Sequence, residues 1–243
     1  MLSFRSSLAG GVGVTFYRFA HRLVRAILGY GWGITVHGAE HIPARGAAIL
    51  AVNHVSLLDP FLVGVTLQRP VWFMAKEEMF RHRALAALMR RLQAYPVRRD
   101  RPELSTVKRT LELLRRGEVV MMFPEGTRGD GIAPGPVRPG VSLLAARAGA
   151  PVIPVFHAGM ERVLPRGARW PRRHPLMVRF GTPLRPPPAV LTSAAAASAF
   201  GEQLRIQWDL LRAATGGGEQ QRIRRGRQAR RRRQERRDDL YDR

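Results

Sequence analysis

The sequence predicts an α/β protein with a mainly parallel central sheet flanked by helices. Short, nearly continuous apolar runs recur after residue 33, and stretches with a helical pattern separate several of them. Strands that are apolar on both faces are typical of a parallel sheet covered by helices on each side. The 243 residues, 45% of them hydrophobic, are enough for one large core, and the sequence contains no internal repeat.

Strand-like and helix-like segments alternate along this domain. The expected strands are ITVHG (34–38), AAILAV (47–52), VWFMAK (71–76), YPVRR (95–99), VVMMF (119–123), PVIPVFH (151–157) and LMVRFG (176–181). The expected helices are FLVGVTLQ (61–68), FRHRALAALMRRLQ (80–93), ELSTVKRTLELLRRG (103–117) and GVSLLAARAG (140–149). Gly117 and Gly149 follow basic or Ala-rich last turns, which is a common way for a helix to end.

An N-terminal segment precedes the domain. We expect residues 1–32 to form an interfacial helical segment and residues 33–215 to form the globular domain. In TFYRFAHRLVRAIL (15–28), three arginines fall on one side of a helix, and aromatic and aliphatic residues cover the other. This pattern fits equally well a helix packed on its own domain and a helix lying in a membrane interface.

The charge of the chain points to an anionic partner. The formal net charge is +23, and Lys76 and Lys108 are the only lysines. Residues 216–243 form an Arg-rich tail that begins with three glycines. We expect this tail to be disordered or loosely helical. This tail has eleven arginines and five acidic residues, a net charge of +6, so most of the positive charge belongs to the domain. Nucleic acid and a membrane surface both fit such a charge.

Several kinds of site are absent from the sequence. Without cysteine, the chain has neither disulfides nor thiolate metal sites. No stretch reaches the roughly 18 uninterrupted apolar residues of a membrane-spanning helix. The motifs G-x-S-x-G, H-E-x-x-H and G-x-x-x-x-G-K-[ST] do not occur, and the spacing of the histidines indicates no metal cluster. We therefore expect neither a catalytic metal nor a bound cofactor.

The stretch AVNHVSLLDPF (51–61) contains the first candidate site. A step of five residues in a regular helix leaves two side chains about 140° apart, so His54 and Asp59 can meet only where regular structure breaks. A strand ending at Val52 and a helix beginning near Asp59 or Pro60 would supply that break. Either Asp59 or Ser56 would suit the N-cap of the helix. His54 is then expected at a strand-to-helix turn, a favoured place for chemistry in α/β folds.

A second polar cluster follows another buried strand. In VVMMFPEGTRGDG (119–131), Glu125 and Arg128 flank Gly126 and Thr127 where the strand leaves the sheet. The carboxyl ends of parallel strands form the clefts of open α/β sheets. Glycine allows a close approach of the backbone to a ligand, and arginine offers a fork that matches phosphate. A salt bridge within a turn would also explain the pair Glu125 and Arg128.

With these stretches the chain resembles the glycerolipid acyltransferases of the 1-acylglycerol-3-phosphate acyltransferase type. Four sequence blocks appear in the order of that family. They are N-H-x-S-x-x-D-P (residues 53–60), A-K-x-E-[LM]-F (residues 75–80) with a hydrophobic-x-Arg ending at Val97 and Arg99, F-P-E-G-T-R (residues 123–128) and V-I-P-V (residues 152–155). Three positions depart from the family pattern. In the second block, Gln93 stands where the family has Gly, and Arg98 stands where it has an acid or Asn. After the third block, Gly129 stands where the family has Ser.

The resemblance implies transfer of a fatty acyl group to the hydroxyl of 1-acyl-sn-glycerol-3-phosphate, which makes phosphatidic acid. His54 would be the general base and Asp59 would orient its imidazole. The other expected substrate-binding residues would hold the acceptor phosphate or orient its glycerol; they are Asn53, Lys76, Arg99, Glu125, Gly126, Thr127 and Arg128. Acyl-CoA or acyl-carrier protein would be the co-substrate, and no further cofactor is implied.

The location implied is the cytoplasmic face of a bacterial cell membrane, where the enzyme would bind an anionic surface peripherally. Other acceptors stay open: another lysophospholipid, glycerol-3-phosphate or an amino-lipid. A basic nucleic-acid-binding protein is an alternative of a different class. No stacking-aromatic motif or recognition helix accompanies the charge, so we do not expect nucleic acid as the partner.

Overall fold

A single mixed sheet organises the molecule. The computed structural model describes residues 11–98, 104–129, 133–165, 167–168 and 170–215 of the chain. Within these ranges the strands are β1 (Ile34–His37), β2 (Ala48–Val52), β3 (Val71–Lys76), β4 (Ala94–Val97), β5 (Val119–Met122), β6 (Val152–Ala158) and β7 (Leu176–Phe180). Their order is β1-β7-β6-β2-β5-β3-β4, and every neighbouring pair is parallel except β6 and β7. The expected α/β fold with a mainly parallel sheet is confirmed.

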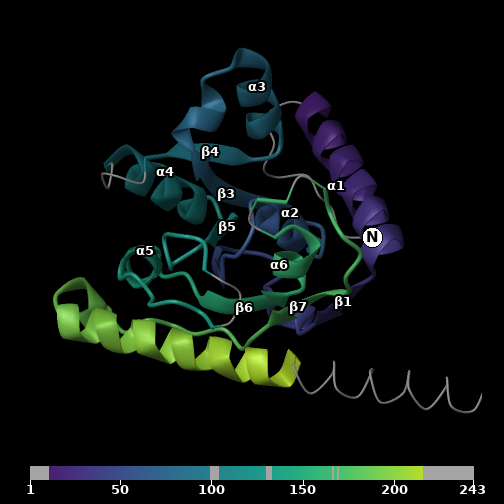
Figure 1. Ribbon diagram of the computed structural model, residues 1–243. Coiled ribbons are helices and arrows are strands. Elements are labelled where there is room, and N and C mark those ends of the chain that lie inside the picture. The colour runs from purple at the N-terminus through teal and green to yellow at the C-terminus, as the bar shows by residue number, and fades with distance from the viewer. Residues whose placement is uncertain (1–10, 99–103, 130–132, 166, 169, 216–243) are drawn as a thin grey trace, which may run out of the picture.

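Helices cover both faces of this sheet (Figure 1). The α-helices are α1 (Gly11–Trp32), α2 (Asp59–Gly64), α3 (Arg83–Arg91), α4 (Leu104–Arg115), α5 (Gly140–Ala148) and α6 (Met160–Val163), and a further helix spans residues 194–215. The 3₁₀ turns are η1 (Ala39–His41), η2 (Glu77–Phe80) and η3 (Pro188–Leu191). One buried cluster joins the sheet to α1, α2 and α3, and a second joins it to α4, α5 and the helix of residues 194–215.

The central strand β2 shows why the sequence folds this way. All five of its residues are buried, and alternate side chains enter the two clusters: Leu50 and Val52 face α1 and α2, whereas Ile49 and Ala51 face α5. A strand that packs on both faces must be apolar at every position, as this one is. Because β2, β5 and β6 are parallel neighbours, the residues after their last positions meet at one edge of the sheet.

The helix boundaries correct one local prediction. Neither Ser56 nor Asp59 is the N-cap of α2, because the cap position is Leu58 and Asp59 lies in the first turn. The carboxylate of Asp59 points back to the preceding turn, where it accepts backbone N–H groups, and is therefore not a cap of its own helix. The predicted helix ends at Gly117 and Gly149 are confirmed, with φ of 77° and 61°, values that glycine adopts without strain.

The helix of residues 194–215 has no counterpart among the predicted elements. It buries Phe200, Leu204 and Trp208 against the sheet, and Trp208 Nε1 donates a hydrogen bond to the carbonyl of Ala51 at 3.0 Å. Figure 1 shows it running along the face opposite to α1. It therefore packs against β2, the strand that leads into the candidate site.

The helix α1 packs on the domain and also leaves apolar side chains exposed. Its residues Tyr17 and Leu28 are buried against the domain, with Val24 partly buried beside them. Its other apolar side chains stay at the surface: Phe19, Leu23, Ile27 and Tyr30 are 64%, 48%, 51% and 97% exposed. No helix in the described ranges is long and apolar enough to cross a membrane. Residues 1–10 and the tail, 216–243, lie outside the described residues.

Candidate active site

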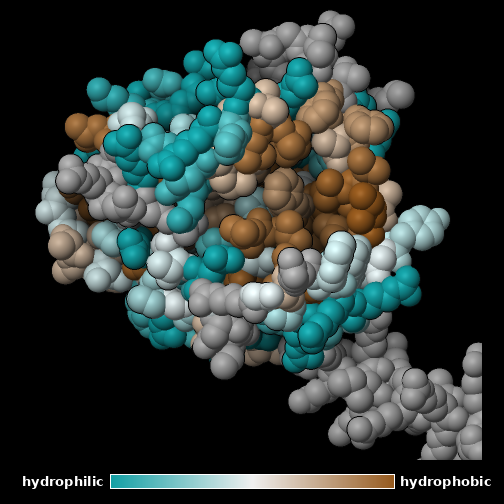
Figure 2. All heavy atoms as spheres, turned by 45° about the horizontal axis from the view of Figure 1, so that its top comes forward, coloured by the Kyte–Doolittle hydropathy of each residue, from teal (hydrophilic) through white to brown (hydrophobic). Residues whose placement is uncertain are grey.

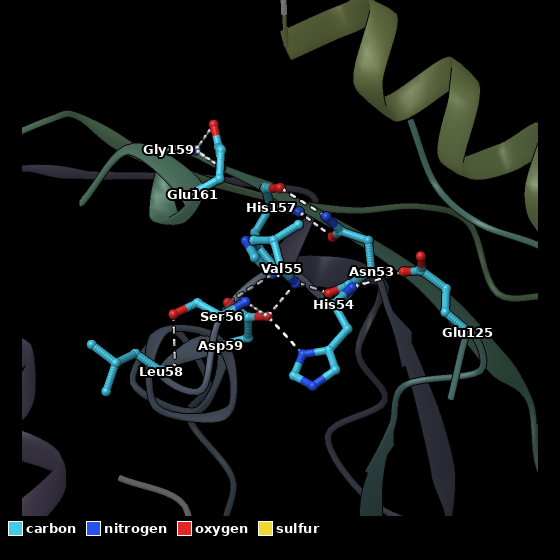
Figure 3. Close-up of polar contacts among 10 residues, drawn as sticks. All are labelled: Asn53, His54, Val55, Ser56, Leu58, Asp59, Glu125, His157, Gly159 and Glu161. Atoms are coloured by element: carbon cyan, nitrogen blue, oxygen red, sulfur yellow. Dashed lines mark hydrogen bonds and ion pairs between the residues drawn. The ribbon is translucent and has the colours of Figure 1, made fainter. Parts of the chain in front are cut away.

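His54 and Asp59 form a buried pair directly after β2 (Figure 3). Nδ1 of His54 lies 2.8 Å from Oδ2 of Asp59, and the two residues are 4% and 0% exposed. The chain turns between them from the end of the strand into α2, which is the break in regular structure that their spacing requires. The ring of His54 also stacks on Phe123 from the turn after β5, with centroids 4.2 Å apart.

The pairing determines the tautomer of His54. An ionised carboxylate accepts hydrogen bonds but cannot donate, so Nδ1 must carry the hydrogen, and in the neutral ring Nε2 then holds a lone pair. No hydrogen bond to Nε2 occurs among the described residues, and Figure 3 shows it turned away from Asp59. The ring can therefore accept a proton on the side that faces away from the carboxylate.

Asp59 is held in its ionised form. Oδ2 accepts two further hydrogen bonds, from the backbone N–H groups of Val55 at 2.7 Å and Ser56 at 2.8 Å. Burial alone would raise the pKa of Asp59, but the charge of His157 and the hydrogen bonds from His157, His54 and Ser56 hold it well below its ordinary value. The site thus contains a carboxylate that remains charged at neutral pH.

Glu125 connects the two candidate turns. Its Oε1 accepts the backbone N–H of His54 at 2.8 Å, and its Oε2 accepts that of Gly135 at 2.8 Å. The Gly129 N–H returns a bond of 2.7 Å to the carbonyl of His54. Both oxygens of this buried carboxylate are thus used on the backbone. The structure thus shows Glu125 positioning the turn of His54, and its expected contact with the acceptor stays a prediction.

Asn53 is also used inside the protein. Its amide donates to the carbonyl of His157 at 3.1 Å and accepts the His157 N–H at 2.8 Å, so that it continues the ladder between β2 and β6 (Figure 3). The side chain is buried, with 4% of the residue exposed. We therefore place Asn53, like Glu125, among the residues that shape the site.

His157 belongs to this site, although the sequence analysis treats it only as the end of a strand. Its Nε2 lies 3.1 Å from the carbonyl oxygen of Asn53 and 3.4 Å from Oδ1 of Asp59. Burial alone would lower the pKa of His157, but the carboxylates of Asp59 and Glu161 and the Asn53 carbonyl raise it above its ordinary value. The available signal was a histidine at the end of an otherwise apolar strand, 151–157.

The remaining candidate residues lie at the same edge of the sheet. Thr127 is exposed and Arg128 half-buried in the turn after β5, and Lys76 is exposed at the end of β3, the strand beside β5. Gly126 has a φ of 74°, and a side chain there would come within 2.6 Å of Arg138, so this turn requires glycine. The expected phosphate ligand Arg99 lies outside the described residues.

Two backbone N–H groups of the turn after β5 donate hydrogen bonds within the protein. The N–H groups of Gly126 and Gly129 donate to the carbonyls of Phe123 and His54 at 3.0 and 2.7 Å. In this conformation they are therefore not available to stabilise the negatively charged oxygen of a reaction intermediate. Over the described part of the chain, no group of three His, Cys, Asp or Glu residues is arranged to hold a metal ion.

An apolar groove opens beside the histidine–aspartate pair. Its volume is about 360 Å³, and it lies between α1, α2, α3 and β3. Pro60 and Phe61, the two residues after Asp59, form one wall, and Leu88 and Leu92 form another. Figure 2 shows hydrophobic side chains gathered around a hollow, with hydrophilic surface on several sides. The apolar groove therefore includes the residues that directly follow Asp59 in the chain.

Comparison with known proteins identifies the family. The Acyltransferase family model matches residues 33–158. The 1-acyl-sn-glycerol-3-phosphate acyltransferase of Bacillus subtilis is 31% identical over 144 residues, which cover 59% of this chain and 71% of that protein. A chloroplastic 1-acyl-sn-glycerol-3-phosphate acyltransferase of Brassica napus is 30% identical over 157 residues, 63% of this chain and 45% of that protein. The chain thus spans less than half of the chloroplastic relative.

A solved structure agrees with this assignment at the level of the fold. PlsC, the 1-acyl-sn-glycerophosphate (LPA) acyltransferase from Thermotoga maritima, has a TM-score of 0.66 at 22% identity, covering 84% of this chain and 80% of that chain. The family model spans more than half of the chain and contains the His54–Asp59 pair, the turn at residues 123–128 and β6. The chain therefore belongs to the acyltransferase family, as its four sequence blocks predict.

Proposed function

We propose that this protein transfers a fatty acyl group from an acyl thioester, acyl-CoA or acyl-carrier protein, to the free hydroxyl of 1-acyl-sn-glycerol-3-phosphate. The observation that carries the proposal is the buried pair of His54 Nδ1 and Asp59 Oδ2, 2.8 Å apart, with Nε2 directed away from the carboxylate. The relatives from Bacillus subtilis and Brassica napus have this acceptor in their names, which supports the same acceptor here.

The chemistry follows from the tautomer. Nε2 of His54 accepts the proton of the acceptor hydroxyl while that oxygen attacks the thioester carbonyl carbon. The imidazolium that forms is stabilised by Asp59, whose negative charge is maintained against burial by His157 and by the N–H donors to Oδ2. When the tetrahedral intermediate collapses, the carbon–sulfur bond breaks and the thiolate takes the proton. The alcohol becomes an ester, and the histidine returns to its starting form.

The apolar groove suits the acyl chain. Its lining is nearly all apolar, and it begins at the residues next to Asp59, so a chain lying in it would bring its thioester close to His54. Burial of apolar surface contributes about 25 cal/mol for each Å², which makes such a groove a natural site for a fatty chain.

The acceptor phosphate would be held by the cations at the sheet edge. Arg128, in the turn that encloses His54, is the best placed of the described arginines, and Lys76 follows the adjacent strand. Arginine matches two phosphate oxygens at once, whereas lysine acts as a single charge. We keep Arg99 in this role as a prediction from the sequence.

Contact with the membrane would be made by α1. The exposed residues Phe19, Leu23 and Ile27 follow one another at steps of four, so they form one stripe on this helix. Arg18, Arg22 and Arg25 lie exposed on the same helix, where they suit anionic headgroups. We propose that the enzyme binds the cytoplasmic face of the membrane peripherally through this helix.

The decisive experiment is a panel of acceptors assayed with both acyl donors. We expect the highest kcat/KM with 1-acyl-sn-glycerol-3-phosphate, and a severe loss for this acceptor in Arg128→Ala because its phosphate loses a bidentate partner. Arg147→Ala, an exposed change on α5, is the matched control and should leave transfer unchanged. A preference for glycerol-3-phosphate, an amino-lipid or a lysophospholipid without a terminal phosphate would contradict the proposed acceptor.

A further inference from the structure

The two oxygens of Asp59 are held very differently. Oδ2 accepts three N–H groups, from His54, Val55 and Ser56. The buried Oδ1 accepts no hydrogen bond of good geometry from any described residue. It forms one ion pair, with Nε2 of His157 at 3.4 Å. A buried carboxylate oxygen without a donor is unfavourable, so this second histidine is the group that balances it.

The topology places both histidines over the same carboxylate. The strands β2 and β6 are parallel neighbours in which Val52 pairs with Val155. His54 and His157 each follow two residues later, and side chains two positions apart lie on the same face of a sheet. The helix α2 then brings Asp59 to that face, between the two rings (Figure 3).

The hydrogen on His157 can be placed. Nε2 faces two acceptors, the carbonyl oxygen of Asn53 and Oδ1 of Asp59, so this nitrogen carries the hydrogen. The Asn53 amide bonds both backbone groups of His157, donating to its carbonyl at 3.1 Å and accepting its N–H at 2.8 Å. These two bonds determine the position of the His157 ring along β6. The residue is completely enclosed, with 1% exposed, and cannot contact substrate itself.

We propose that His157 is a positioning residue for acyl transfer, which holds Oδ1 of Asp59 so that Oδ2 stays directed at His54. The inference rests on the proposed function, because it extends the catalytic pair to an enclosed set of three residues. Without the second histidine, the carboxylate is held on the Oδ2 side alone, and the buried Oδ1 loses the ion pair that balances its charge. Tilting or protonation of the carboxylate then changes the orientation of His54, and small displacements of a catalytic group cost large factors in rate.

The same arrangement depends on pH. The titratable groups that face His157 directly or through Asp59 are Asp59 itself, His54 from the turn after β2 and Glu161 from α6. Burial opposes a charge on His157, but its carboxylate neighbours raise the pKa of this ring above its ordinary value. Its ion pair with Oδ1 of Asp59 therefore strengthens as the pH falls.

The test compares two substitutions of His157. His157→Gln places an amide N–H near the position of Nε2 but does not titrate, whereas His157→Leu removes the donor. We expect kcat to fall about 10- to 100-fold in His157→Leu, with KM for both substrates nearly unchanged. His157→Gln should recover most of kcat, because its amide N–H can still face Oδ1 of Asp59. His37→Gln, an exposed change on β1, is the matched control.

A second comparison separates positioning from general damage to the fold. In an Asp59→Asn background, His157→Leu should reduce kcat by less than about twofold, because its effect passes through the carboxylate already removed. In the substrate-free protein, the Nδ1–H proton signal of His54, assigned by its loss in His54→Ala, should shift or broaden in His157→Leu and stay in place in His37→Gln. This NMR measurement needs no acyl acceptor, and the kinetics use whichever acceptor the wild-type enzyme prefers.

Three results would overturn the inference: wild-type kcat in His157→Leu, an equal loss in the Gln and Leu variants, or a full additional loss in the Asp59→Asn background. An unchanged His54 signal in His157→Leu would do the same. A different preferred acceptor would contradict the proposed function and leave the role of His157 standing.

Discussion

Glu125→Gln tests whether Glu125, in the turn after β5, acts on the protein or on the acceptor. The two carboxylate oxygens accept the backbone N–H groups of His54 and Gly135, each at 2.8 Å. Glutamine has almost the same shape, but one of its two terminal atoms is an NH₂ group. Whichever way the amide turns, one backbone N–H then faces a donor and loses its acceptor.

The expected loss of stability follows from this one backbone N–H group that lacks an acceptor. A buried donor left without an acceptor costs about 1–3 kcal/mol. For a domain of this size, 1 kcal/mol corresponds to roughly 2–4 °C in the melting temperature, so we expect a fall of about 2–12 °C. If the lost bond is the one to His54, the ring moves relative to the acceptor, and a displacement of about 1 Å costs about 10²-fold in rate.

The assay pairs thermal unfolding with acyl-transfer kinetics at varied acceptor concentration. We expect a lower melting temperature and a lower kcat, with KM for the acceptor nearly unchanged, because both Glu125 oxygens accept hydrogen bonds from the backbone. Glu112→Gln, on the exposed surface of α4 where its carboxylate pairs with Arg109, is the matched control. A wild-type melting temperature together with a raised acceptor KM would refute the reasoning and return Glu125 to the role expected from the sequence.

Three further outcomes are expected. His54→Ala should lose at least the ~10²–10⁴-fold that a general base contributes, with an unchanged circular dichroism spectrum, and Asp59→Asn should lose less; near-normal turnover in folded His54→Ala would remove the mechanism. Replacing Phe19, Leu23 and Ile27 together by serine should release the protein from neutral liposomes in co-sedimentation, and unchanged binding would assign membrane contact elsewhere. Because the pKa of Asp59 is lowered on folding, its ionisation stabilises the fold above pH ~4 and this contribution is lost as the pH falls further. The stability difference between wild type and Asp59→Asn in urea should therefore shrink toward pH 3, and a difference that stays constant from pH 7 to 3 would contradict the low pKa.

The sequence alone determined the fold class, the family and the catalytic candidates. Apolar strands such as residues 47–52 must pack on both faces, which implies a parallel sheet under helices on each side. The five-residue step from His54 to Asp59 requires a break in regular structure, and the structure has it between β2 and α2. The helix of residues 194–215 was predictable too, because Phe200, Leu204 and Trp208 recur at helical spacing, but Ala-rich sequence around them weakened the apolar pattern.

Only the tertiary structure decided which polar groups meet. The position of β6 beside β2 brings His157 to Asp59, although Asn53 and His157 lie 104 residues apart. No local pattern encodes that contact, because strand order results from the packing of the whole sheet. The same holds for Glu125, whose carboxylate binds the backbone 71 residues away. The sequence offered a substrate contact or a salt bridge for Glu125, and only the fold shows that this buried carboxylate accepts N–H groups of the protein itself.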